Sequence, residues 1–354
     1  MFYRENGQFK STYRADQQIF PIRQDRVFML AVLLAAFVLV PAMASDYFLQ
    51  AIFIPFLILS LAAIGLNILV GYCGQISIGS GAFMAVGAYA AWNFGVRLPW
   101  MPLVGQILLG GVFATLVGIV FGVPSLRIRG LYLAVTTLAA QFFVDWAFLR
   151  IPYFTNYSAS GNVSVPALHA FGLPVQTPVQ RYLFVLFFVA VFALLAKNLV
   201  RGAIGRQWMA IRDMDVAAAV IGIRPMYAKL SAFAVSSFII GVAGALWAYI
   251  HLGSWEPLAF DLGRSLQLLF IVIIGGMGSI VGSFFGAAFM VLLPVLLTNI
   301  PHTFGLSIAV DTASHIEHIV FGALIVFFLI AEPHGLARLW SIGKEKLRIW
   351  PFPH

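Results

Sequence analysis

The amino-acid sequence predicts an all-α polytopic membrane protein with about ten transmembrane or partly membrane-embedded helices and with both termini in the cytoplasm. Its composition is the first reason: 61% of the 354 residues are hydrophobic and 10% are charged, whereas a soluble domain carries about 25% charged residues. The second reason is a series of apolar runs, most of them close to the roughly 20 residues that a helix needs to cross a bilayer. The third is the position of Lys and Arg, which lie in the polar segments between these runs. Because the cations are dispersed in this way, the net charge of +8 does not indicate nucleic-acid binding.

The apolar runs follow a polar N-terminal arm of residues 1–26. They cover residues 27–44, 47–70, 81–96, 103–123, 131–150, 179–199, 229–251, 265–275, 279–299 and 316–331. The first run also fits a signal peptide, since residues 42–44 read Ala-Met-Ala. The second run follows at once, and we therefore interpret 27–44 as a retained first span. The runs 81–96 and 265–275 are short for a crossing, so we expect broken or partial helices there.

Lys and Arg are distributed unequally between alternate polar segments. If every run is a passage and both ends are inside, 17 of the 21 Lys and Arg face the cytoplasm, as the positive-inside rule requires. The predicted organisation is a cytoplasmic arm (1–26), a transmembrane permease-like domain (27–331) and a cytoplasmic tail (332–354). The long periplasmic loop 151–178 is rich in Pro, Ser, Asn and Gly, which suits either a docking surface or a plain connector. The external cations are Arg97, Arg150, Arg181 and Arg264.

The longest polar interruption of the second half is the segment 201–225. The cations in and beside it place it in the cytoplasm: they are Lys197, Arg201, Arg206, Arg212, Arg224 and Lys229. Asp213 or Asp215 can cap a short helix over residues 216–220, and Gly222 suits the left-handed position that ends it. Such a helix lies outside the bilayer, and its mixed polar and apolar surface suits a soluble partner better than lipid. An ordinary basic loop is the alternative explanation of this composition.

Two glycine clusters stand at matching places, each after a passage that runs inward. They span residues 71–81 and 275–286, and both lead into Ala-Phe-Met, which we interpret as a weak internal repeat of the kind common in transporter folds. Glycines and small polar residues would let the backbone unwind beside a polar path, which a bilayer tolerates only inside protein or around water. The candidate pathway residues are Gly71, Gly74, Gln75, Ser77, Gly79, Ser80, Gly275, Gly276, Gly278 and Ser279. The alternative is close helix packing, because Gly278, Gly282 and Gly286 recur every four residues.

The chain contains no nucleotide-binding fingerprint. No GxxxxGK[ST] motif occurs, and neither glycine cluster lies at a strand-to-helix turn. Any ATPase must therefore be another polypeptide, and we expect no cofactor in this chain. Its single cysteine, Cys73, excludes both an internal disulfide and a cysteine-based zinc site.

Few other residues suggest ligand or proton chemistry. His315 and His318 can share a helix face, with Asp311 or His302 as a third metal ligand, but we interpret them as polar residues at the outer mouth of the last span and expect no metal. Asp145 is the nearest approach to an intramembrane carboxylate, a type of residue that is usually functional. It lies within helical reach of an arginine at residue 150, so we interpret it as interfacial rather than as a proton relay.

Several short motifs occur in a fixed order along most of the chain. They are 71–79 (GYCGQISIG), 81–83 (GAF), 126–134 (LRIRGLYLA), 205–206 (GR), 210–213 (AIRD), 222–223 (GI), 229–230 (KL), 232–233 (AF), 275–279 (GGMGS) and 332–336 (EPHGL). In these motifs the chain resembles the membrane subunits of bacterial ABC importers for branched-chain amino acids, of the LivM type. The resemblance covers residues 61–336, and it is the order and spacing of the motifs together that make it specific.

The resemblance implies a permease fold like that of the cobalamin importers, in the bacterial inner membrane. It implies a homologous second permease subunit of the LivH type, two cytoplasmic ATPase subunits that bind ATP and Mg²⁺, and a periplasmic substrate-binding protein. It further implies that residues 206–222 form the segment that couples this chain to an ATPase subunit. The implied coupling residues are Arg206, Gln207, Ala210, Ile211, Arg212, Asp213, Ala217, Ala218 and Gly222.

Two positions depart from the family pattern. Ser80 stands where a histidine often follows the glycine, and Gln267 replaces a more usual glutamate. Both lie near the expected pathway, so the substrate stays open between branched-chain or other hydrophobic amino acids and urea, short amides or aromatic acids. The alternatives of another class are an ion-coupled secondary transporter, for which paired buried charges are lacking, and an intramembrane enzyme, for which a polar catalytic group at depth is lacking.

Overall fold

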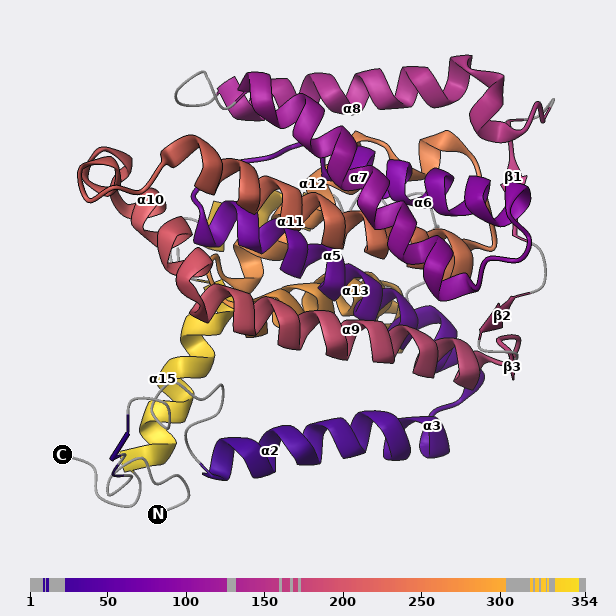
Figure 1. The fold of residues 1–354 in the computed structure, drawn as a ribbon. Helices are drawn as coiled ribbons and strands as arrows, with labels where there is room; N and C mark the ends of the chain where they lie inside the picture. The colour runs from indigo at the N-terminus through magenta and orange to yellow at the C-terminus, as the bar shows by residue number, and fades with distance from the viewer. Residues whose placement is uncertain are drawn as a thin grey trace.

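The computed structural model describes residues 23–125, 132–158, 161–165, 168–170, 173–303 and 335–349, with residues 9, 11, 12, 319, 320, 322–324, 326–328 and 330. These residues form an all-α polytopic bundle, as the composition predicts (Figure 1). The α-helices are α2 (Arg23–Leu34), α3 (Val40–Met43), α4 (Asp46–Phe48), α5 (Ile54–Asn67), α6 (Ser80–Arg97), α7 (Leu103–Ser125), α8 (Tyr132–Arg150), α9 (Pro178–Arg201), α10 (Ala203–Val220), α11 (Pro225–Leu246), α12 (Leu262–Gly275), α13 (Ile280–Thr303) and α15 (Gly335–Ile349).

Shorter elements join or interrupt these helices. π-helical turns cover Ala35–Leu39, Leu49–Phe53, Ile68–Tyr72 and Trp247–Leu252, and 3-10 turns cover Pro152–Thr155 and Pro257–Phe260. The strands are β1 (Val163–Ser164), which pairs antiparallel with β4 (Ser254–Trp255), and β2 (His169–Ala170), which pairs antiparallel with β3 (Leu173–Pro174). Part of the loop 151–178 is thus tied by β1 to the segment that precedes α12.

Eight helical segments of the described residues are long and apolar enough to cross a membrane. They are Asp25–Met43, Asp46–Tyr72, Leu103–Pro124, Leu133–Arg150, Pro178–Arg201, Pro225–Leu252, Pro257–Gly275 and Ile280–Leu297. Each overlaps a predicted apolar run. The last predicted run, 316–331, lies mostly outside the described residues.

The two runs expected to be partial helices lie in longer segments in the structure, and the second is a broken helix within the candidate span Pro257–Gly275. Helix α6, from the run 81–96, is 18 residues long, or about 27 Å, slightly less than the hydrocarbon thickness of a bilayer. Helix α12, from the run 265–275, has 14 residues and follows the 3-10 turn Pro257–Phe260 across an extended residue, Asp261. The side chain of Asp261 accepts a hydrogen bond from the backbone N–H of Arg264 and so caps the new helix.

Helices α5 and α11 form the centre of the bundle, and 83% of the most apolar window of each of their spans is buried. Glycines allow α6 to approach α11 at backbone distance. A Cβ atom added at Gly87 would lie 2.1 Å from the carbonyl oxygen of Gly241, and one added at Gly244 would lie 2.1 Å from the oxygen of Met84. Small residues at helix interfaces are the main way in which transmembrane helices pack closely, because lipid supplies no hydrophobic drive between them.

Opposite ends of the bundle differ in character (Figure 1). Helices α10 and α15 lie at one end, while β1, β2 and β3 lie at the other. An ion pair of 3.3 Å between Lys344 of α15 and Asp25 of α2 ties the C-terminal helix to the first span. The segments 201–225 and 335–349 and the start of the first span therefore share one end, as the predicted topology requires.

Candidate coupling and pathway site

Helix α10 occupies most of the segment 201–225, and it is longer than the predicted helix over 216–220. It runs from Ala203 to Val220 and is kinked at Met214, whose φ of −162° and ψ of 97° are extended rather than helical. The predicted caps are wrong: Met214 is the extended residue before the second half, whereas Asp213 pairs with Arg212 and Asp215 with Lys229. Asp213 and Asp215 therefore form ion pairs and not helix caps.

The C-terminal end of α10 is the one that the sequence predicts. Gly222 has a φ of +92°, in the left-handed region. Its N–H bonds to the oxygen of Ala219, and the N–H of Ile223 bonds to the oxygen of Ala218 at 3.0 Å. These bonds satisfy carbonyl groups that the helix leaves without partners, which is how a glycine ends a helix.

One face of α10 packs on the bundle and the other is exposed. Trp208 is fully buried, and its indole N–H donates to the hydroxyl of Ser231 on α11 at 2.9 Å. On the other face the implied coupling residues Arg206, Gln207, Asp213 and Ala217 are exposed. Large apolar side chains lie beside them, since Val216, Val220 and Ile221 are also exposed. This is a mixed charged and apolar surface of the kind that protein partners cover.

Arg212 extends from α10 into the transmembrane domain. Its Nη1 donates to the carbonyl oxygen of Gly71 at 3.0 Å, while its Nε donates to Asp213 at 2.9 Å. Its aliphatic stem lies on Gly74, where an added Cβ would be 2.9 Å from the Arg212 Cγ atom. Gly74 also has a φ of +71°, so glycine is required there for two reasons.

The two predicted glycine clusters meet at this point. A Cβ atom at Gly71 would lie 2.1 Å from the backbone nitrogen of Gly278, so the two backbones are in direct contact. Asn67, which is 1% exposed, holds them together. Its Oδ1 accepts from the N–H of Gly278 at 2.8 Å, and its Nδ2 donates to the oxygen of Ser279 at 2.8 Å and to the hydroxyl of Ser283 at 3.0 Å.

Sequence reasoning missed Asn67. The available signal was its position, because it is an amide deep in a mostly apolar run, and a buried polar group there needs partners. Gly282 and Gly286, by contrast, pack as the alternative interpretation expects. A Cβ at Gly282 would lie 2.6 Å from the oxygen of Gly275, and one at Gly286 would lie 2.0 Å from the oxygen of Ile271, both in α12.

Beyond the glycine contact the chain leaves the helical conformation. The span Asp46–Tyr72 ends in the π-helical turn Ile68–Tyr72, and residues 74–79 are irregular before α6 begins at Ser80. Gln75, Ser77 and Ser80 are 6%, 1% and 0% exposed. Their side-chain polar atoms are buried and have no hydrogen-bond partner among the described residues. An unpaired buried polar group costs about 1–3 kcal/mol, so these three side chains do not stabilise the fold through hydrogen bonds among the described residues.

A polar cluster holds the start of α6 against α8 and α12. The backbone N–H of Ala82 donates to Oε1 of Gln141, and that of Gly81 donates to the hydroxyl of Ser265, both at 2.7 Å. Ser265 in turn donates to Gln141 at 2.8 Å. These contacts satisfy N–H groups that the first turn of a helix leaves open. The irregular segment is anchored in the same way, since Ile78 N–H donates to the hydroxyl of Thr137 at 3.0 Å.

Gln141 is also the hydrogen-bond partner of Asp145. Its Nε2 lies 3.0 and 3.1 Å from the two carboxylate oxygens, and 2.9 Å from the oxygen of Phe260. The sequence led us to expect Arg150 beside this carboxylate, and among the described residues no ion pair joins them. The carboxylate therefore belongs to the polar cluster at the α6, α8 and α12 junction.

Some predicted features fall outside the described residues. These are the motif residues 126–131 and 332–334 and the histidines at 315 and 318 with the acidic residue at 311. Within the residues that the structure does describe, no group of three His, Cys, Asp or Glu side chains could hold a metal ion.

Comparisons with known proteins agree with the motif resemblance. A family model described as branched-chain amino acid transport system, permease component, matches residues 48–329. The LivM permease proteins of the high-affinity branched-chain amino acid transport systems of Escherichia coli and Salmonella typhimurium are each 28% identical over 298 residues, which cover 77% of this chain and 66% of theirs. This chain thus spans slightly less than two thirds of the length of those two relatives. A probable LivM permease of Methanocaldococcus jannaschii is 24% identical over 271 residues, which cover 72% of this chain and 76% of its own. No solved structure matches significantly.

Proposed function

The chain belongs to the family of branched-chain amino acid transport system permease components, and we propose that it is the permease subunit of an ATP-driven importer. It is a multi-pass inner-membrane protein. The proposed cargo is a branched-chain or other hydrophobic amino acid, which the names of the relatives support. The proposed partners are a homologous second permease, two cytoplasmic ATPase subunits that bind ATP and Mg²⁺, and a periplasmic binding protein.

The observation that carries this proposal is the contact of Arg212 with Gly71. Helix α10 has an exposed mixed surface for a partner on one face, and on the other its arginine bonds directly to the end of the second span. A partner that pulls or pushes α10 would therefore act on Gly71 and, through the backbone contact and Asn67, on Gly278. Both glycine clusters would respond to one displacement, which is the coupling that an ATP-driven permease needs.

The candidate pathway continues from this contact. Gln75 and Ser77 of the irregular segment 74–79, with Ser80 at the start of α6, follow the coupling contact in the chain and precede the polar cluster. Irregular backbone at membrane depth is tolerated where it is buried in protein or lines a water-filled path. In the proposed mechanism, alternating access exposes this segment to one side of the membrane at a time as the helices exchange two packings. The cobalamin-importer-like arrangement of the helices is part of this proposal.

The substrate has a second candidate class within the same family. Ser80 and Gln267 depart from the family pattern, and Gln267 accepts a hydrogen bond from Arg264 in the same helix. The cargo of such a permease could then be urea, a short amide or an aromatic acid. Thermal-shift screening of the cognate binding protein against each class discriminates them, since the cargo alone should raise the melting temperature.

Reconstitution of the full chain with its co-purifying partners tests the proposal. Expressed in its own host, the tagged chain should bring an ATPase and a second permease with it, and proteoliposomes of this assembly should accumulate the amino acid only with ATP and binding protein. If the chain were an ion-coupled transporter, it would accumulate cargo by itself, from an ion gradient and without ATP. That result would replace the proposal with the secondary-transporter alternative.

A further inference from the structure

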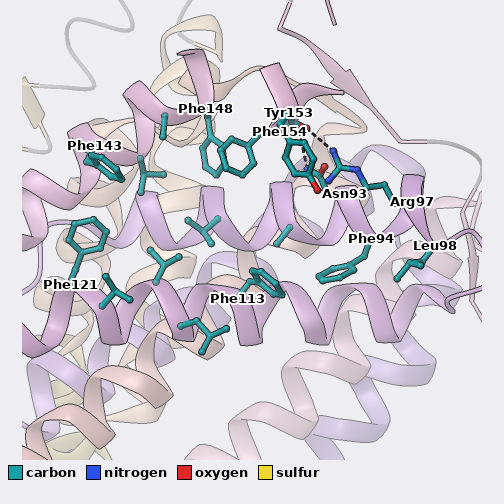
Figure 2. A pocket seen from close by; sticks show the side chains of 17 residues that line it. Asn93, Phe94, Arg97, Leu98, Phe113, Phe121, Phe143, Phe148, Tyr153 and Phe154 are labelled. Atoms are coloured by element: carbon teal, nitrogen blue, oxygen red, sulfur yellow. Dashed lines mark hydrogen bonds between the residues drawn. The ribbon is translucent and has the colours of Figure 1, made fainter. Parts of the chain in front are cut away.

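A long apolar groove lies between α6, α7 and α8, with the 3-10 turn Pro152–Thr155 at one end (Figure 2). Its volume is about 810 Å³, which is in the range of about 300–1,000 Å³ for ligand pockets. Polar side chains gather at one end, where Asn93, Arg97 and Tyr153 lie together, while aromatic residues such as Phe121 and Phe143 line the other (Figure 2). A ligand that matches this groove has one polar end and one apolar end, as an amphiphile does.

The length of the groove matches one leaflet of a bilayer. On α6 the lining residues extend from Val86 to Arg97, eleven helical steps or about 16 Å. The hydrocarbon core of a bilayer is about 30 Å thick, so one leaflet contributes about half of that. The polar end lies at the end of the bundle opposite α10, where Trp100 and Tyr153 are exposed as in an aromatic belt at the headgroup level.

Arg97 can bind an anion at this level. It is the one charged side chain among the lining residues. Its guanidinium lies 3.5 Å from the centre of the Tyr153 ring, and its Nη2 donates to the backbone oxygen of Tyr153 at 2.9 Å. These contacts fix the side chain but use few of its five N–H donors. A fixed guanidinium with free donors suits a phosphate group, which arginine binds in a bidentate manner.

The groove is open to the bilayer. Leu116, Val120 and Phe143 line it and are 51%, 67% and 53% exposed. The acyl chains of surrounding lipid can therefore reach its apolar surface directly.

We propose that this groove binds a phospholipid of the leaflet opposite α10, with acyl chain along α6, α7 and α8 and the phosphate on Arg97. Bound lipid would fill the space between α8 and α7 and so hold α8, which carries Gln141 of the polar cluster, at its observed distance from α6. The proposal stands on the groove alone and does not depend on what the protein transports.

Thermal unfolding of the purified full-chain assembly in detergent tests the binding. Phosphatidylglycerol should raise the melting temperature more than diacylglycerol with the same chains, because only the former carries a phosphate. Arg97→Gln should make the two lipids equal. Ala147→Phe, which fills the groove, should abolish both shifts and reduce the co-purifying phospholipid measured by mass spectrometry. Leu195→Phe is the matched control, since this residue of α9 is 54% exposed and lies outside the groove.

Equal responses of Ala147→Phe and Leu195→Phe would overturn the proposal, as would an unchanged preference for phosphatidylglycerol in Arg97→Gln. A photocrosslinking side chain at Phe113, which lines the groove, gives a readout that does not depend on a destabilising variant. It should capture phospholipid, and capture of the second permease there instead would show that the groove is a subunit contact.

Discussion

Arg212 of α10 donates a hydrogen bond of 3.0 Å to the carbonyl oxygen of Gly71, which lies 141 positions earlier in the chain. The contact joins the segment that the motif resemblance implicates in coupling to the end of the second span. The charged pair formed by Arg212 and Asp213 is half exposed, with side-chain exposures of 38% and 64%. Its attraction adds little to stability, so the bond to Gly71 is the contact of Arg212 that joins α10 to the second span.

Arg212→Glu should uncouple ATP hydrolysis from transport. The change removes the bond to Gly71 and places a carboxylate beside backbone oxygens, while Trp208 still holds α10 on the bundle. Since a hydrogen bond from a charged group contributes about 1.5–3 kcal/mol, uptake by the reconstituted assembly should fall about tenfold or more. ATP hydrolysis should continue. Arg338→Glu, an exposed cation of α15, should leave both rates unchanged, and equal uptake in the two variants would refute the prediction.

Gly71→Ala should destabilise the contact between the two glycine clusters. The added Cβ would lie 2.1 Å from the backbone nitrogen of Gly278 and 2.0 Å from Oδ1 of Asn67, so the spans must separate. Overpacking of this kind costs about 1–3 kcal/mol, which should be visible as a lower melting temperature of the assembly. Gly343→Ala in α15 meets nothing within 4 Å, and because alanine favours a helix it should raise stability slightly. If Gly71→Ala and Gly343→Ala changed the melting temperature equally, the close contact assigned to Gly71 and Gly278 would be contradicted.

Gln75→Leu should separate the pathway interpretation from the packing interpretation. Both polar atoms of Gln75 are buried without a partner among the described residues, so removing them should leave the melting temperature equal or higher. Uptake should nevertheless fall about tenfold, because the proposed pathway loses a polar side chain that stabilises the passing substrate by about 1.4 kcal/mol. The contrast is Gln106→Leu on α7, whose amide bonds to Tyr249 and to Met101. That variant should lose stability, and a Gln75→Leu protein that does the same while transporting normally would favour packing.

Cys73 should be an unreactive thiol in the resting protein. It follows the span Asp46–Tyr72, and burial raises its pKa to about 12, with Lys229 acting weakly in the opposite direction. Thiolate is the reactive form, so maleimide labelling of the native chain should be far slower than that of the denatured chain at both pH 7 and pH 9. Labelling of the denatured chain should increase severalfold, since an ordinary thiol titrates near pH 8.5. As Cys73 is the only cysteine, the wild-type chain serves without mutagenesis.

The raised pKa of Cys73 also determines how the free energy of unfolding changes with pH. Above the unfolded pKa the unfolded chain has released its thiol proton while the folded chain keeps it, so the free energy of unfolding falls as pH rises. The loss begins near the ordinary value of about 9 and continues to about 12. Below pH 8 the thiol is protonated in both states, so the free energy of unfolding should not change with pH because of this group. A melting temperature that rose between pH 9 and pH 10 in the wild type, relative to Cys73→Ser, would contradict this.

The helices were more predictable than the site. Each of the eight described spans overlaps an apolar run, because length and hydropathy are local properties of the chain. The glycine clusters were identified from the sequence, but not their contact, and Asn67 that holds them was not noticed. The kink at Met214 was missed too, because nothing local favours an extended residue between two aspartates. Asp213 pairs with its neighbour Arg212, and Asp215 pairs with Lys229 of the next helix, which folding brings near.

The amino-acid sequence by itself determined that this is a multi-pass membrane protein of one permease family. Composition, the length of its apolar runs and the order of its motifs are all readable without folding. Only the tertiary structure decided that α10, the second span and the second glycine cluster meet at one place, and that α6, α7 and α8 enclose a groove with Arg97 at its end. The physical reason is that these contacts join residues far apart in the chain, and no local pattern encodes which backbone will approach which.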